Sequence, residues 1–186
     1  MLAEIYSMLV RCLGVPPTEF EWTRYDKEGK PVETKKYTPK SFYEEYFGGI
    51  DLEKDFVMVM NDPSREYYKV YEIDYDRHVY DGDNWLYLNL PIDEVKALAI
   101  ASIKDNTAMY FSCDVGKFLD RKRGVLDINR FDYESLMGVE FPMDKEQRVR
   151  TFASGSSHAM TLIAVDLDEN GNAKKWMVEN SWGPQA

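Results

Sequence analysis

The sequence predicts an α+β fold with mixed local order, in which helices and an antiparallel sheet are built from alternating stretches of the chain. The 186 residues are 44% hydrophobic and 14% aromatic, which is enough apolar surface for a folded core. Helical spacing of apolar residues is interrupted by short runs of strand-forming residues that turn residues separate. The most regular strand pattern, over residues 158–180, is that of a hairpin, so its sheet is expected to be antiparallel.

The first predicted elements are a helix, a hairpin and a second helix. Apolar residues stand at helical spacing over residues 3–13, namely Ile5, Met8, Leu9 and Cys12. Polar and aromatic residues alternate over 19–25 and lead into turn residues, which predicts a strand with a short return strand. Thr38 and Pro39 are the residue types of an N-cap and a first helical position, so a helix is expected over 39–47.

The middle of the chain is rich in strand signals. Three strands are predicted, over residues 55–60, 67–75 and 85–90. A helix with acidic residues in its first turn follows over 91–105, and then a buried strand over 107–112. Residues 114–143 are expected to form short helices and loops.

Two long strands, over 158–167 and 175–180, flank the turn sequence Asp-Glu-Asn-Gly near the end of the chain. With this hairpin the chain divides into a helical and insert region, residues 1–106, and a sheet region, residues 107–186. No repeat or linker separates the two regions, so one domain, or one lobe of a larger one, is expected.

The charge balance disfavours nucleic acid and membranes as partners. Lysine and arginine number 23 against 33 acidic residues, giving a net charge of −10. The basic run Arg121, Lys122 and Arg123 is too short to overturn that. No apolar run approaches the roughly 18 residues of a membrane-spanning helix, and the first ten residues lack a basic leader. With only two cysteines, a soluble protein of a reducing, cytoplasm-like compartment is expected.

Metal and phosphate sites find little support in the sequence. Cysteine and histidine do not cluster at zinc-ligand spacing, and no glycine-rich turn joins a strand to a helix. The run 81–84 offers oxygen ligands without the spacing of a calcium loop. We therefore predict neither a metal site nor a cofactor site.

The candidate chemistry involves one histidine and one asparagine. Of the two histidines, His78 lies among polar residues and is expected to be a surface residue. His158 follows the small residues 154–157 and opens an apolar strand, so its ring can stand at the edge of a sheet with room for a substrate. By position alone, a structural role for His158 is equally open. Asn180, at the end of the partner strand, could accept a hydrogen bond from the ring and fix its tautomer.

Hairpin geometry decides whether these two side chains meet. A two-residue turn, 170–171, would put His158 and Asn180 on opposite faces of the hairpin. A three-residue loop, 169–171, with Gly171 in the left-handed region, or a compensating bulge, would make them diagonal neighbours on one face. The catalytic interpretation therefore predicts the second arrangement.

Two motifs resemble those of a known enzyme family. The sequence Gly-Ser-Ser-His-Ala-Met at 155–160, followed 22 residues after the histidine by Asn180 in Glu-Asn-Ser-Trp-Gly, resembles the histidine and asparagine motifs of papain-like cysteine peptidases. The match is closest to the bleomycin hydrolase and aminopeptidase C branch, which residues 87–96 and 110–117 also resemble.

The resemblance implies a partial papain-like fold and three roles. His158 would be the general base and acid, Asn180 would orient it, and Trp182 would shield their hydrogen bond from water. It further implies amino-terminal trimming of peptide substrates in the cytoplasm, no cofactor and a ring-like homo-oligomer.

The chain departs from the family pattern at the nucleophile. Cys12 lacks the neighbouring residues of the family's nucleophilic cysteine, and its helical spacing predicts a buried structural thiol. Cys113 has the right order relative to His158 and Asn180, but Asp114 opposes its ionisation. Its separation from His158 falls short of the roughly 130–150 residues of papain-like enzymes.

We therefore expect a C-terminal portion of such a peptidase, without the nucleophile half and inactive by itself. The alternative is a non-catalytic pseudoenzyme or a module that binds peptides or a partner chain. A third possibility is one active site assembled from two polypeptides.

Overall fold

The structure is a computed structural model that describes residues 1–77 and 79–183. The chain divides into two compact units, Met1–Val57 and Met58–Ala186. Both units combine helices with strands that pair mainly antiparallel, which confirms the predicted α+β class. His78, predicted to be a surface residue, lies outside the described residues.

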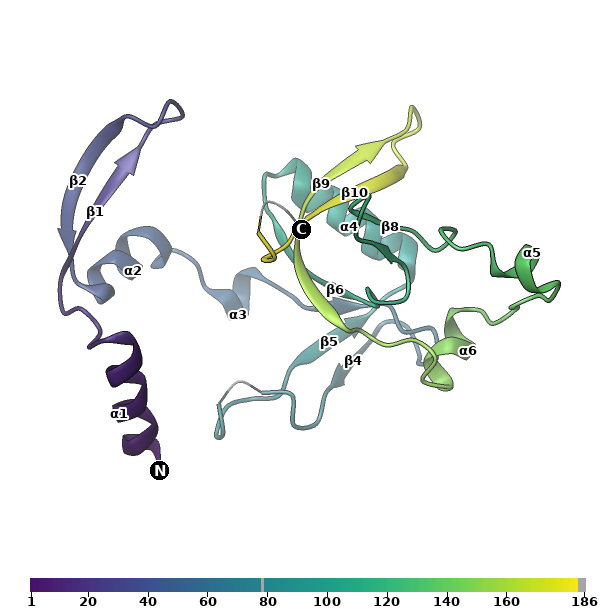
Figure 1. Cartoon of the computed structure of the whole chain (residues 1–186), viewed down its shortest axis with the longest axis horizontal. Coiled ribbons are helices and arrows are strands. Elements are labelled where there is room, and N and C mark those ends of the chain that lie inside the picture. Colours follow the sequence, from purple (N-terminus) through teal and green to yellow (C-terminus); the bar gives the residue numbers. More distant parts are fainter. Residues whose placement is uncertain (78, 184–186) are drawn as a thin grey trace. The chain divides into compact units, whose positions relative to one another are not determined.

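The first unit consists of a helix, a hairpin and two further helices (Figure 1). Their bounds are α1 Leu2–Leu13, β1 Phe20–Tyr25, β2 Pro31–Tyr37, α2 Pro39–Phe47 and α3 Leu52–Asp55. Thr38 caps α2 through a reciprocal pair of hydrogen bonds with Ser41, as the sequence predicts for Thr38. The prediction of a short return strand is wrong, because β2 has seven residues against six in β1.

Aromatic packing holds α2 against the hairpin. Tyr37, at the end of β2, is only 5% exposed, and its ring meets that of Phe42 edge to face at 5.3 Å. Phe42 also contacts Phe20 of β1 at 5.5 Å and Tyr46 at 4.6 Å. Edge and tilted contacts of this kind add to the gain from burying the rings.

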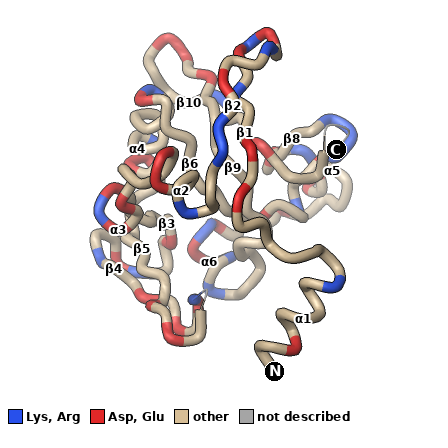
Figure 2. The backbone as a smooth tube through the Cα atoms, turned by 90° about the vertical axis from the view of Figure 1, so that its left-hand side faces the viewer, with Lys and Arg blue, Asp and Glu red and all other residues tan. Residues whose placement is uncertain are grey.

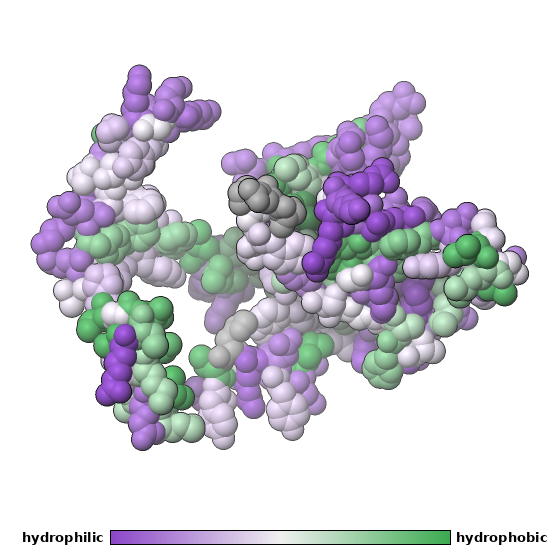
Figure 3. Space-filling view, viewed as in Figure 1, coloured by the Kyte–Doolittle hydropathy of each residue, from purple (hydrophilic) through white to green (hydrophobic). Residues whose placement is uncertain are grey.

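Helix α1 is the place where the burial prediction fails. The predicted helical spacing is confirmed, but none of the residues of α1 is buried and Cys12 is exposed. Figure 3 shows apolar side chains gathered over this helix. The physical reason is that spacing defines an apolar face but does not supply the surface that would cover it.

The second unit contains the remaining strands and helices (Figure 1). The strands are β3 Val59–Met60, β4 Lys69–Glu72, β5 Leu86–Asn89, β6 Met109–Cys113, β7 Leu119–Asp120, β8 Val125–Leu126, β9 His158–Leu167 and β10 Ala173–Glu179. The helices are α4 Ile92–Lys104, α5 Tyr133–Met137 and α6 Lys145–Arg150. They form one antiparallel sheet in the order β10-β9-β6, one mixed sheet in the order β3-β5-β4, and the small β7-β8 hairpin.

Several predicted boundaries in this unit are wrong. The strand expected over 55–60 is reduced to β3, and its first residue, Asp55, belongs to the short helix α3, which the side chain of Asp51 caps. The β7-β8 hairpin lies within a stretch predicted to hold only helices and loops. Helix α6 follows that stretch and begins with a capping box formed by Asp144 and Gln147.

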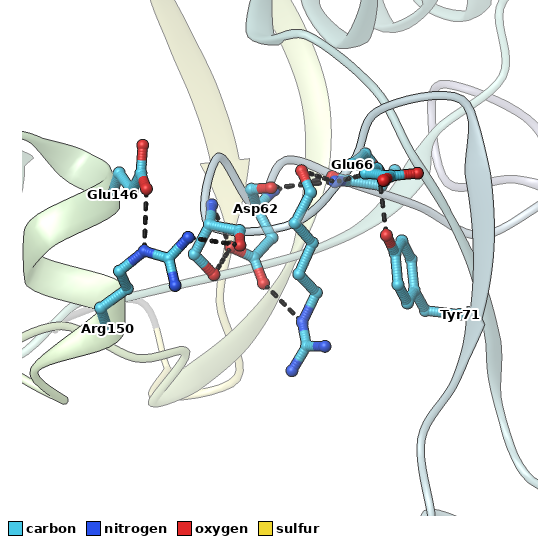
Figure 4. Close-up of polar contacts among 8 residues, drawn as sticks. Asp62, Glu66, Tyr71, Glu146 and Arg150 are labelled. Atoms are coloured by element: carbon cyan, nitrogen blue, oxygen red, sulfur yellow. Dashed lines mark hydrogen bonds and ion pairs between the residues drawn. The ribbon is translucent and has the colours of Figure 1, made fainter.

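A buried asparagine organises the loop that joins β3 to β4. The side chain of Asn89, at 0% exposure, donates to the carbonyls of Asp62 and Glu66 and accepts from the Asp62 amide at 2.8 Å. Arg150 of α6 reaches the same loop and donates to the carbonyl of Ser64, while Glu146 holds its guanidinium (Figure 4). The end of α6, from which the chain continues to β9, is therefore attached to this loop.

Buried apolar side chains are few in the described residues, and they are Tyr37, Leu90, Val115 and Leu162. Leu162 belongs to the central strand of the β10-β9-β6 sheet, and Val115 follows β6. Within the described ranges, the structure contains no helix of the length and apolarity that a membrane crossing requires.

Candidate functional site

The loop between β9 and β10 has the three residues that the catalytic interpretation predicts. The Asp168 amide donates to the carbonyl of Asn172 at 2.9 Å, and the Gly171 amide donates to the carbonyl of Asp168 at 3.0 Å. Gly171 has φ 84°, in the left-handed region that favours glycine. The three-residue loop predicted for residues 169–171 is therefore confirmed.

Two bulges along the hairpin cancel each other. The pairing skips Lys174 in β10 and then Ile163 in β9, so the register returns to its starting value before the strands end. Glu179 then lies opposite Thr161, and the next residue, Asn180, lies diagonally across from His158. With only one of the two bulges, Asn180 would lie on the other face of the hairpin.

His158 and Asn180 are hydrogen bonded. The distance between His158 Nε2 and Asn180 Oδ1 is 3.0 Å, and both residues are partly buried. The amide of Ser181 donates to the same Oδ1 at 2.8 Å, which identifies that atom as the oxygen. An amide oxygen only accepts hydrogen bonds, so Nε2 carries the proton of the neutral ring and Nδ1 keeps its lone pair.

Trp182 covers this pair. Its ring stacks on the imidazole of His158, with centroids 4.8 Å apart and planes 25° from parallel. The indole is 45% exposed, so one part of it faces solvent while the other covers the imidazole. The structure therefore brings together the three residues for which the family resemblance implies roles.

Asp114 anchors the serine-rich loop that precedes His158. Its Oδ2 accepts a hydrogen bond from the Ser154 hydroxyl at 2.9 Å and pairs with Lys117 Nζ at 3.0 Å. Burial acts to raise the pKa of Asp114, but the hydrogen bonds from Lys117 and Ser154 outweigh it and hold the pKa below its usual value. Sequence reasoning considered this carboxylate only as a neighbour of Cys113 and missed its structural role.

Hydrogen bonds from β6 and the residues after it complete the support of that loop. The Ser157 amide donates to the carbonyl of Cys113 at 2.9 Å, and the Ser157 hydroxyl accepts from the amide of Val115. The hydroxyl of Ser112 donates to the carbonyl of His158 at 3.1 Å. The backbone of His158 is thus held from the β6 side while its side chain is held from the β10 side.

Cys113 is the direct partner of His158 across the β6-β9 pair. Residues opposite each other in an antiparallel pair project to the same face, so Cys113 and His158 are neighbours on one face of the sheet. Burial, followed by the charge of Asp114, raises the pKa of Cys113, which opposes the thiolate that a nucleophile needs. The proximity was not predicted, since it depends on the register of β6 and not on sequence separation.

A shallow open cavity of about 420 Å³ lies beside the β7-β8 hairpin. Its lining consists of Gly116, Leu119, Asp120, Arg121, Lys122 and Arg130. Asp120 is buried and pairs with Arg130 at 3.0 Å. The guanidinium of Arg121 extends to the Trp182 ring, with its Cζ 5.7 Å from the ring centroid. The cavity therefore borders the group formed by His158, Asn180 and Trp182.

Comparison with known proteins gives a consistent result. Residues 1–186 match the model of the Peptidase C1-like family over their whole length. The chain is 40% identical to aminopeptidase C of Lactococcus lactis subsp. cremoris, 38% to aminopeptidase E of Lactobacillus helveticus and 39% to human bleomycin hydrolase, and at least 98% of it is covered in each case. The crystal structure of PepW from Lactobacillus rhamnosis HN001 is similar, with a TM-score of 0.87 and 36% identity over 99% of the chain.

The chain is much shorter than these proteins. It covers 41–42% of the length of the three curated relatives and 41% of the PepW chain. The part of them to which it corresponds is the C-terminal part.

Proposed function

The chain belongs to the Peptidase C1-like family, and on that premise we propose that it is the C-terminal part of a cysteine aminopeptidase that hydrolyses peptide bonds through a Cys-His-Asn triad. The observation that carries the proposal is the hydrogen bond between His158 Nε2 and Asn180 Oδ1. It orients the ring and leaves Nδ1 as the nitrogen that faces a nucleophile.

In the proposed reaction, Nδ1 of His158 takes the proton of the nucleophilic thiol. The thiolate attacks the peptide carbonyl and forms a tetrahedral intermediate, which collapses as the imidazolium donates its proton to the leaving amine. The acyl-enzyme is then hydrolysed by a water whose proton passes to the same Nδ1. Asn180 keeps the ring oriented through both halves, and Trp182 excludes water from their hydrogen bond.

We assign the nucleophile to a part of the complete peptidase outside this chain. The raised pKa of Cys113 argues against that thiol, although Cys113 lies opposite His158. Cys12 lies in α1 without the neighbouring residues of the family's nucleophilic cysteine. A histidine and an asparagine without a nucleophile cannot form an acyl-enzyme, so the chain alone is expected to be inactive.

A chimera tests the proposal. Replacing the C-terminal part of the Lactococcus lactis aminopeptidase C with this chain is expected to give an enzyme that cleaves an aminoacyl reporter amide. His158→Gln should lower kcat by about 10²–10⁴-fold, the contribution of general acid–base catalysis. Asn180→Ala should lower it by about a hundredfold, since a misplaced ring loses that much. Cys113→Ala is the matched control and should leave kcat unchanged.

Each other outcome has a clear meaning. A chimera that folds, binds peptide and cleaves nothing would favour a non-catalytic binding module over the peptidase. Activity of the chain alone that disappears with Cys113→Ala would make Cys113 the nucleophile and contradict our assignment. Activity that needs two separately expressed halves would support assembly from two polypeptides.

Three further properties belong to the proposal. We place the protein in the cytoplasm, supported by two cysteines that are both free thiols. We also propose that the complete peptidase is a homo-oligomer and that its substrates are peptides cleaved at the amino terminus. Light scattering of the complete protein tests the oligomeric state, and reporters with a free or a blocked amino group test cleavage at the amino terminus.

A further inference from the structure

We propose that Arg121 is a positioning residue that holds Trp182 over the hydrogen bond between His158 and Asn180. This inference rests on the proposed function, because the position of Trp182 matters for catalysis only if His158 and Asn180 are catalytic. The contact itself can be tested without measuring catalysis. Arg121 stands in the turn between β7 and β8, far in sequence from both Trp182 and His158.

The contacts form a short series. The imidazole of His158 stacks on the indole of Trp182 at 4.8 Å, and the guanidinium of Arg121 lies over that indole at 5.7 Å. Separations of this size are those of a ring stack and a cation–π contact. Arg121 thus contacts the shield and not the catalytic pair, which defines it as a residue that acts through Trp182.

The guanidinium is available for this contact. Within the described ranges, Arg121 forms no ion pair and no hydrogen bond, although the neighbouring carboxylate of Asp120 is close in sequence. Asp120 is already taken, since it pairs with Arg130 at 3.0 Å and accepts from the amide of Lys122. Figure 2 shows lysine and arginine residues in blue on the tube near β8.

Trp182 needs such a contact because little else holds it. The residue follows the end of β10 at Glu179 and lies outside regular structure, and 45% of its surface is exposed. A cation–π contact at an exposed site contributes about 0.5–1 kcal/mol, a two- to fivefold change in the equilibrium constant between the seated and the unseated ring. The planar guanidinium suits the indole face better than an ammonium group does.

Tryptophan fluorescence of the 186-residue chain measures the seating. A protonated imidazole quenches an indole stacked on it, so acidification should dim Trp182 in the wild-type chain. The signal of Trp182 is isolated by subtracting the curve of Trp182→Phe, and His158→Gln should abolish the change.

Arg121→Ala is expected to lower the amplitude of this quenching, because loss of the cation–π contact lowers the equilibrium constant for seating about two- to fivefold. Arg121→Lys should retain part of the amplitude, because the charge stays and the planar group is lost. Lys122→Ala, which removes the next cation along the chain, is the matched control and should leave the curve unchanged. Arg121 is exposed, and circular dichroism of each variant checks that it folds.

The proposal is overturned if Arg121→Ala gives the wild-type curve. It is equally overturned if Lys122→Ala lowers the amplitude as much, since general charge and not contact would then be responsible. Failure of the proposed function looks different: the quenching responds to Arg121 as expected, while the wild-type chimera hydrolyses no peptide amide.

Discussion

At the scale of single residues, Asn89 stabilises the second unit by holding the loop that joins β3 to β4. Its side chain is fully buried and makes hydrogen bonds to three backbone carbonyls and one backbone amide of residues 62–66. Buried backbone groups that lose their partner each cost about 1–3 kcal/mol. No hydrophobic residue could replace the amide, because the loop around it presents polar backbone groups on several sides.

Asn89→Ala should therefore destabilise the protein by about 3 kcal/mol or more, through unpaired buried groups and a small cavity. The measurement is urea unfolding followed by circular dichroism. Asn129→Ala is the matched control, since Asn129 is exposed and its loss should change the free energy of unfolding by about 0.5 kcal/mol or less. Equal effects of the two substitutions would show that the Asn89 network is not a centre of stability.

At the scale of elements, the β9-β10 hairpin sets the geometry of the site through its loop. Gly171 has φ 84°, and no atom lies close to the position that a Cβ atom would take. An alanine here would therefore strain the backbone without causing a steric clash. Gly171→Ala should lower the free energy of unfolding by about 1–2 kcal/mol. Gly155→Ala is the control, because Gly155 also has open space but no positive φ. A loss as large at Gly155 would contradict this explanation.

The loop before β9 should respond to pH through Asp114. The pKa of this carboxylate is lowered in the folded state, so its stabilising effect is complete above the unfolded pKa of about 3.9 and is lost as the pH falls through the lower folded value. Asp114→Asn should thus lower Tm at pH 7, by more than the exposed control Asp74→Asn does, and the difference from wild type should shrink toward pH 2. A difference that grows in acid would contradict the assignment.

At the scale of the whole molecule, local signals predicted the site better than they predicted its surroundings. The three-residue loop and the meeting of His158 with Asn180 follow from turn chemistry and strand periodicity, which depend on neighbouring residues. Whether Cys12 is buried or exposed depends on surfaces that distant segments supply. The residue that lies opposite Cys113 depends on a strand register that distant segments set. Arg121 was interpreted as part of a short basic run, and no local pattern indicates that it reaches Trp182.

The exposed apolar face of α1 leads to the same conclusion. The chain covers about two fifths of the length of its relatives. The sequence pattern shows that an element has an apolar face, but it does not show which surface covers that face. The α+β class and most elements could be predicted from residues 1–186, while the extent of the core could not.

The central claim is that Asn180 holds His158 with its proton on Nε2 and Nδ1 free to act as a base. Nitrogen chemical shifts of the imidazole in the 186-residue chain measure this directly, and His78→Gln leaves His158 as the one histidine signal. We expect a single neutral tautomer protonated at Nε2 in alkaline buffer, and a mixture of both tautomers in Asn180→Ala. A neutral wild-type ring protonated at Nδ1, or the same mixture with and without Asn180, would contradict the claim.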